Sequence, residues 1–173
     1  GVIYKYFGDK QSLFLACVRH SLELLDATLR EAVPEGADAE TSIRALVPAL
    51  IAAARQHGNY NVLYNEITSG SCREFAPELA REIESRTAQL YTRLFETVKE
   101  AGALAPGLAP EAAAFFFDNL LMMLQFSYSC DYYQHRMRLY CGENAAWNDE
   151  MMADQLTRFL LGAMRGEGSC NIS

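Results

Sequence analysis

The 173-residue sequence has no long apolar run. The longest stretch without a charged side chain is 119–130, and it and shorter ones such as 45–54 fall short of the ~20 residues that a membrane-spanning helix needs. No basic segment followed by an apolar segment opens the chain, so we also predict no secretory signal. These absences indicate a soluble protein without membrane contact.

Positive charge is scarce, because 15 Lys and Arg stand against 22 Asp and Glu, for a net charge of −7. A surface of this kind repels nucleic acid and anionic membranes. Residues 1–10 are the exception, since Lys5 and Lys10 there outweigh Asp9. Any contact with DNA is therefore expected at the N-terminal end of the chain.

The five cysteines are odd in number and form no C-x-x-C pair. This pattern is typical of free thiols in a reducing compartment, so we predict a cytoplasmic location. An alternative is a metal or enzyme site built from Cys130, His135 and Cys141, although their spacing matches no structural zinc pattern. Packing of these residues on helix faces is the favoured interpretation, and we predict neither a metal nor a cofactor.

Familiar catalytic motifs are also missing. The sequence contains no G-x-S-x-G, P-loop, H-E-x-x-H or G-x-G-x-x-G motif, and its three histidines are scattered. We therefore predict that the protein is not an enzyme. Alternating patterns typical of β-strands are absent as well, which predicts an all-α fold.

Apolar residues recur with helical spacing along almost the whole chain. Asp9 is placed to cap one helix, and Asn148 or Asp149 another. The segment 110–140 is predicted as one long helix, apolar nearly all round from 112 to 126 and therefore buried on more than one side. The predicted helices cover residues 3–7, 10–33, 39–56, 61–68, 77–101, 110–140 and 148–165.

The opening residues carry a motif of fixed spacing that resembles the signature of the TetR family of bacterial transcription regulators. That signature reads G-x-[LIV]-Y-x-[YH]-F-x-x-K-x-x-L, and it is matched by Gly1, Ile3, Tyr4, Tyr6, Phe7, Lys10 and Leu13. The resemblance implies a TetR-like helical ligand-binding and dimerisation domain with a remnant of an N-terminal helix-turn-helix. We assign residues 1–9 to the remnant, 10–166 to the helical domain and 167–173 to a flexible tail.

The same resemblance implies which residues contact DNA. Tyr4 and Lys10 are expected to touch backbone phosphates, and Lys5 occupies a variable position that reaches bases. Val2 and Tyr6 complete the predicted DNA-binding set, because Ile3 and Phe7 face the helical core and leave them on other faces. The chain begins within the recognition helix, which needs two preceding helices for support. Specific binding to operator DNA is therefore expected only of the full-length protein.

Aromatic residues gather in the middle of the sequence, where an apolar ligand pocket is expected. Asn119 lies on the most apolar predicted helix, where a buried amide needs a polar partner. That partner is either a polar group of the ligand or another protein group, in the core or across a dimer. The predicted pocket residues are Tyr60, Tyr64, Tyr91, Phe95, Phe116, Asn119, Met123 and Phe126.

The two C-terminal helices are the most apolar, and in a monomer they would leave a large exposed patch. We therefore predict a homodimer through these helices. Together with the resemblance, this predicts a ligand-responsive transcription regulator, a repressor that a small hydrophobic or aromatic effector releases from DNA. The alternative is a stand-alone helical module that binds a small molecule without binding DNA.

Overall fold

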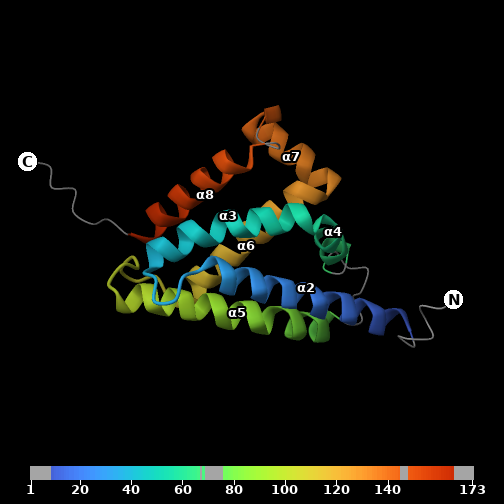
Figure 1. Cartoon of the computed structure of the whole chain (residues 1–173), viewed down its shortest axis with the longest axis horizontal. Helices are drawn as coiled ribbons and strands as arrows, with labels where there is room; N and C mark the ends of the chain where they lie inside the picture. Colours follow the sequence, from blue (N-terminus) through green and yellow to red (C-terminus); the bar gives the residue numbers. More distant parts are fainter. Residues whose placement is uncertain (1–8, 67, 69–75, 145–147, 166–173) are drawn as a thin grey trace, which may run out of the picture.

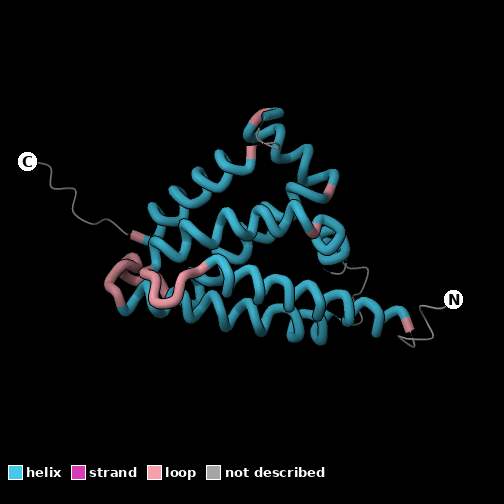
Figure 2. Tube along the Cα trace, in the orientation of Figure 1, coloured by secondary structure: helices cyan, strands magenta, loops and turns pink. Residues whose placement is uncertain are grey.

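In the computed structural model, the described residues 9–66, 68, 76–144 and 148–165 form seven α-helices and no strand (Figures 1 and 2). The predicted all-α class is therefore confirmed. The short helix predicted at residues 3–7 lies outside the described residues. The helices are α2 (Lys10–Ala32), α3 (Ala39–Gln56), α4 (Gly58–Glu66), α5 (Ala76–Glu100), α6 (Pro110–Ser129), α7 (Asp131–Cys141) and α8 (Asp149–Met164).

Three of these helices begin at a side chain that accepts a backbone hydrogen bond. Asp9 caps α2 through the N–H of Ser12 at 2.7 Å, and Asn148 caps α8. The cap at Asp9 was predicted from the sequence, and Asn148 was one of the two residues predicted to cap the last helix. Asp38 caps α3 in the same way, so each helix start satisfies one backbone donor that has no partner within the helix.

The single long helix predicted for 110–140 is wrong, because the chain breaks at Cys130 into α6 and α7. Cys130 has extended backbone angles (φ −111°, ψ 124°). Its N–H still donates to the carbonyl of Phe126, so it ends one helix and precedes the next. The side-chain amide of Gln134 donates to the carbonyl of Tyr128 at 3.0 Å. This bond supplies a partner for a backbone acceptor that the break leaves free.

The core consists of two separate clusters of buried side chains. The larger one surrounds α3, whose Ile43 and Val47 are completely buried, and it also includes residues of α5, α6 and α8. The smaller cluster joins Val18 and Leu22 of α2 to Ile83 of α5. In Figure 1, α3 runs between α8 on one side and the α2–α5 pair on the other, with α6 behind it.

One side chain fixes the end of α3 relative to α8. The guanidinium of Arg55 contacts the carboxylate of Asp149, with an Nη2–Oδ1 distance of 2.7 Å. It also lies 4.1 Å from the centre of the Tyr128 ring. Arg55 thus connects the last turn of α3 to the first turn of α8 and the last turn of α6. Within the described part of the chain, no helix has the length and apolar character needed to cross a membrane.

Candidate functional site

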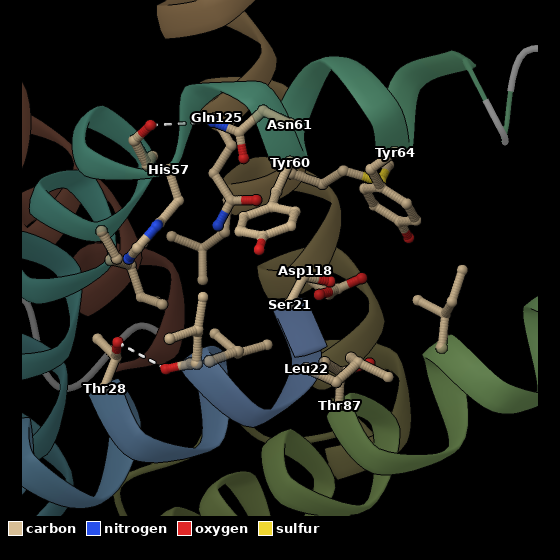
Figure 3. Close-up of a pocket in the computed structure, with 18 of the residues that line it drawn as sticks. Ser21, Leu22, Thr28, His57, Tyr60, Asn61, Tyr64, Thr87, Asp118 and Gln125 are labelled. Atoms are coloured by element: carbon tan, nitrogen blue, oxygen red, sulfur yellow. Dashed lines mark hydrogen bonds between the residues drawn. The ribbon is translucent and has the colours of Figure 1, made fainter. Parts of the chain in front are cut away.

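A cavity of about 130 Å³ lies where the two core clusters meet, between α2, α4, α5 and α6. The end of α3 contributes to its wall through residues such as Leu50 and Ala54. Figure 3 shows Tyr60 and Tyr64 of α4 and Asp118 of α6 directed into this space, opposite the residues of α2. Most of its wall is apolar, and its polar lining residues are Ser21, Thr28, His57, Tyr60, Asn61, Tyr64, Glu84, Thr87, Tyr91, Asp118 and Gln125.

Two carboxylates face this cavity, and no Lys or Arg stands among its described lining residues. Asp118 accepts no hydrogen bond from, and forms no ion pair with, any described residue. Burial raises the pKa of its carboxyl group to about 6, with a further contribution from the negative charge of Glu84. Glu84 accepts a hydrogen bond of 2.5 Å from the hydroxyl of Tyr64.

Two phenol groups of the cavity, those of Tyr64 and Tyr91, are held in their neutral form. Burial raises the pKa of Tyr64, and its hydrogen bond to Glu84 raises it further. The pKa of Tyr91 is also raised, first by burial and then by the charges of Asp118 and Glu84. Only 3% of Tyr91 is exposed, and its hydroxyl has no hydrogen-bond partner among the described residues. The cavity thus contains a free hydroxyl beside two carboxylates.

A second hollow of about 370 Å³ lies between α5 and α6. It shares Glu84, Thr87, Tyr91, Asp118 and Met122 with the first cavity. The two carboxylates therefore stand in the wall that is common to both hollows.

Three of the eight predicted pocket residues, Tyr60, Tyr64 and Tyr91, line the cavity. Phe95 does not line it, because its ring is buried in the larger cluster and packs 5.7 Å from that of Phe117. Phe116 is 58% exposed, since its side chain points about 100° around α6 from the buried Phe117.

The remaining three predicted residues lie near the cavity without lining it. The amide of Asn119 donates to the carbonyl of Phe115, one turn earlier in the same helix, so the polar partner of this amide is a backbone group. Asn119 lines the second hollow. Phe126 packs behind Tyr64, with the ring centres 5.8 Å apart. Met123 is half-buried on α6 and is not among the lining residues.

The residues that the sequence reasoning missed are those of α2 and the two acids. Ser21, Leu25 and Thr28 line the cavity from α2, which contributed no residue to the predicted pocket set. A signal for Asp118 was present, because it is an acidic residue in the most apolar stretch of the chain. Asn119 was singled out because a polar side chain on an apolar helix needs a partner, and the same argument applies to the adjacent Asp118.

The DNA-binding predictions at Val2, Tyr4, Lys5 and Tyr6 fall outside the described residues. Lys10 is the first residue of α2. Of the cysteines that the structure describes, Cys130 is buried, Cys17 is partly buried and Cys141 is exposed. No group of three or more His, Cys, Asp or Glu in the described ranges is arranged to hold a metal ion.

Comparison with solved structures identifies the fold. The chain is similar to a bacterial regulatory protein of the TetR family from Rhodococcus RHA1, with a TM-score of 0.70 and 19% sequence identity. The match covers 96% of this chain and 79% of the other. No family model matches the sequence, and a search of curated proteins found no match. The chain has the fold of a TetR-family regulator.

Proposed function

We propose that the chain is the ligand-binding and dimerisation part of a transcription regulator that responds to a small organic effector. The observation that carries this proposal is the contact of the cavity with α2. Ser21, Leu25 and Thr28 line the cavity from this helix, and the helix begins at Lys10, immediately after most of the DNA-binding motif. A molecule in the cavity therefore touches the element that continues into the motif.

The contacts that hold α2 support a role for this helix in transmitting ligand binding from the cavity to the DNA-binding motif. Its side chain Arg19 forms two hydrogen bonds with Glu82 of α5, of 2.9 and 2.8 Å. Arg86 of α5 lies 3.6 Å from Asp26. These partly exposed ion pairs connect the surfaces of α2 and α5. Pairs of this kind contribute little to stability, so they hold α2 in place only weakly. A ligand that favours another position of α2 would shift the motif, provided that it binds the two arrangements with different affinity.

The proposed functional unit is a homodimer formed through α6, α7 and α8. These helices carry most of the large apolar side chains that the described surface exposes. In a dimer, the separation of two recognition helices must match half-sites about one turn of DNA apart. The exposed side chains on these helices are Phe115, Phe116, Leu120, Tyr132, Leu139, Tyr140, Met151 and Phe159.

Selection of bound DNA from a random-sequence pool tests the proposal, with the complete gene product as the bait. The expected result is enrichment of a roughly palindromic site with half-sites one helical turn apart. A variant with Lys10 replaced by Ala should lose affinity for every sequence, because a phosphate contact carries no sequence information. A protein that enriches no sequence but still binds small molecules would instead be a stand-alone binding module.

A further inference from the structure

The two carboxylates of the cavity stand close together without a positive partner. Burial, and then the charge of Glu84, raise the pKa of Asp118, and no Lys or Arg is found among the described lining residues. At pH 7.5 most Asp118 side chains are nonetheless ionised, since their pKa is about 6. The cavity therefore concentrates negative charge in an apolar surrounding, where such charge is least favourable.

Polar groups of the cavity that lack a protein partner point to a ligand at the same place. Tyr91 is 3% exposed, and its hydroxyl has no hydrogen-bond partner among the described residues. The Asp118 carboxylate likewise has none. Buried polar groups are normally satisfied, so a Tyr hydroxyl and a carboxylate left open on one cavity indicate that something else binds there.

The chemistry of the remaining wall describes the rest of this ligand. The aromatic rings of Tyr60 and Tyr64 stand beside the carboxylates, and rings of this type attract cations through their faces. The other walls are aliphatic, with Leu22 and Leu50 among them. A metal ion does not fit this surrounding, because no cluster of three or more His, Cys, Asp or Glu among the described residues is arranged to hold one.

The size of the cavity limits the apolar part of the ligand. An apolar cavity of about 150 Å³ holds one benzene molecule, and the cavity here measures about 130 Å³. The adjoining hollow of about 370 Å³ begins at the same carboxylates. The cavity of about 130 Å³ thus accepts one ring or a short branched chain. A charged group of the same ligand would lie at the wall between the two hollows, where the carboxylates stand.

We propose that the effector is an organic monocation, a protonated amine or quaternary ammonium with an apolar body of about one ring, held by Asp118 and Glu84. This inference rests on the proposed function, because it names the ligand class of the same cavity. The carboxylates select a positively charged ligand, and the aliphatic and aromatic walls of the cavity bind its apolar body.

Isothermal titration calorimetry at pH 7.5 tests this proposal with three matched compounds. They are 2-phenylethylammonium, 2-phenylethanol and phenylacetate, which share a ring and differ in charge. We expect 2-phenylethylammonium to bind at least tenfold more tightly than 2-phenylethanol, and phenylacetate to bind most weakly. Asp118→Asn should remove most of the preference for the ammonium over the alcohol while leaving affinity for the alcohol within about twofold.

Two further variants distinguish the effect of a carboxylate in the cavity from the effect of the net charge of the protein. Glu84→Gln should also weaken the binding of 2-phenylethylammonium, since it removes the second carboxylate. Glu96→Gln removes the same charge from an exposed position of the same helix, α5, and should leave all three affinities unchanged. Thermal unfolding of each variant establishes that it is folded.

Each adverse result has a distinct meaning. Equal binding of ammonium and alcohol, or tighter binding of phenylacetate, would overturn the charge selection while the cavity remained a ligand site as proposed. A preference for the ammonium that persists in both Asp118→Asn and Glu84→Gln would place the cation elsewhere and overturn the inference. Failure of all three compounds to bind would overturn the inference and remove the support that the cavity gives to the proposed function.

Discussion

The side-chain amide of Asn61 donates a hydrogen bond of 2.9 Å to the hydroxyl of Ser129, which lies 68 positions further along the chain. The same amide donates to the carbonyl of Ala54 at 3.1 Å. Three helices, α3, α4 and α6, are thus joined at one buried side chain beside the cavity. Gly58 lies close by, since a Cβ atom there would come within 3.1 Å of the Ser129 hydroxyl oxygen.

Asn61→Ala should destabilise the protein by about 1–2 kcal/mol, because the Ala54 carbonyl loses a donor in a buried place. Thermal or urea unfolding measures the change. Asn59→Ala on the same helix is the control, since Asn59 is exposed, and its effect should stay below about 0.5 kcal/mol. Equal effects of the two substitutions would mean that the Asn61 contacts contribute nothing to stability.

Asp118→Asn should make the ligand-free protein more stable at neutral pH. The pKa of Asp118 is raised from 3.8 to about 6 by burial and by Glu84, so the folded protein holds its proton more tightly than the unfolded chain. Stability then falls as the pH rises through this range, and the loss is complete above pH 6. We expect a gain of about 1–2 kcal/mol for the variant at pH 7.5, after allowing for solvent near the carboxylate.

The pH dependence distinguishes this effect from better packing. At pH 4.5 the gain of Asp118→Asn should shrink by more than half, since the folded wild type is then protonated at this residue. The other titratable groups that line the cavity are Glu84 and Tyr91 of α5, Tyr60 and Tyr64 of α4, and His57, which are common to both proteins. A gain that is the same at both pH values would contradict the assigned cause.

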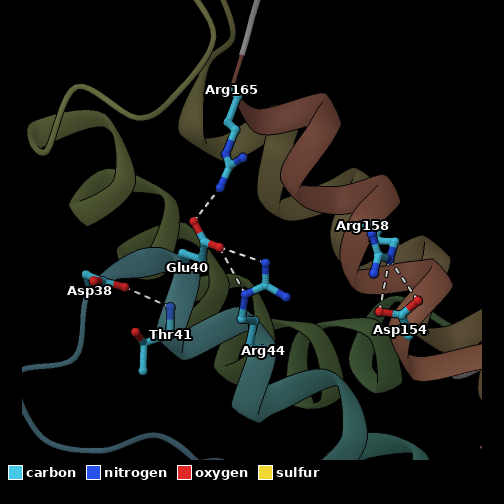
Figure 4. A network of polar contacts seen from close by, with 7 residues as sticks. All are labelled: Asp38, Glu40, Thr41, Arg44, Asp154, Arg158 and Arg165. Atoms are coloured by element: carbon cyan, nitrogen blue, oxygen red, sulfur yellow. Dashed lines mark hydrogen bonds and ion pairs between the residues drawn. The ribbon is translucent and has the colours of Figure 1, made fainter. Parts of the chain in front are cut away.

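Asp38→Ala should cost about 1 kcal/mol, because it removes the side chain that caps α3 through the N–H of Thr41 at 2.7 Å. Figure 4 shows this cap beside the exposed ion pairs of Glu40 with Arg165 and of Asp154 with Arg158. Asp154→Ala, measured by the same unfolding experiment, should cost less than about 0.5 kcal/mol, since exposed ion pairs are screened by water. The opposite order would mean that the cap is not formed in solution.

Phe159→Glu and Phe116→Glu should each convert the proposed dimer to a monomer. The two side chains are 63% and 58% exposed, on α8 and α6, and a charge there would be buried without a partner in an interface. Sedimentation velocity measures the change in mass. Val62→Glu on α4, where Val62 is 43% exposed, is the control and should remain dimeric. A wild-type protein that sediments as a monomer would contradict the prediction.

The sequence predicted helices well where local signals mark their ends. Asp9 and Asn148 mark helix starts because a short polar side chain just before a helix can accept a hydrogen bond from the backbone N–H groups of its first turn. The break at Cys130 has no such signal. At the break the amide of Gln134 reaches back to the carbonyl of Tyr128, a contact that neither residue reveals in a helical pattern.

The pocket was harder to predict because α6 is apolar on nearly every side. Phe116 and Phe117 are neighbours about 100° apart on a helix, and one is 58% exposed while the other is 1% exposed. Periodicity carries no information about which face is buried when all faces are apolar. Tyr60 and Tyr64, which lie one turn apart on a short helix and share a face, both line the cavity.

The division of the core into two clusters has a consequence for how amide hydrogens exchange with solvent. Around α3, where Ile43 and Val47 are fully buried, exchange requires opening of the larger cluster and should be slowest. The first half of α2 is held by the smaller cluster around Val18 and Leu22, so its amides should exchange much faster. A molecule that fills the space between the clusters should slow this exchange first in α2 and α4, while leaving α8 unchanged.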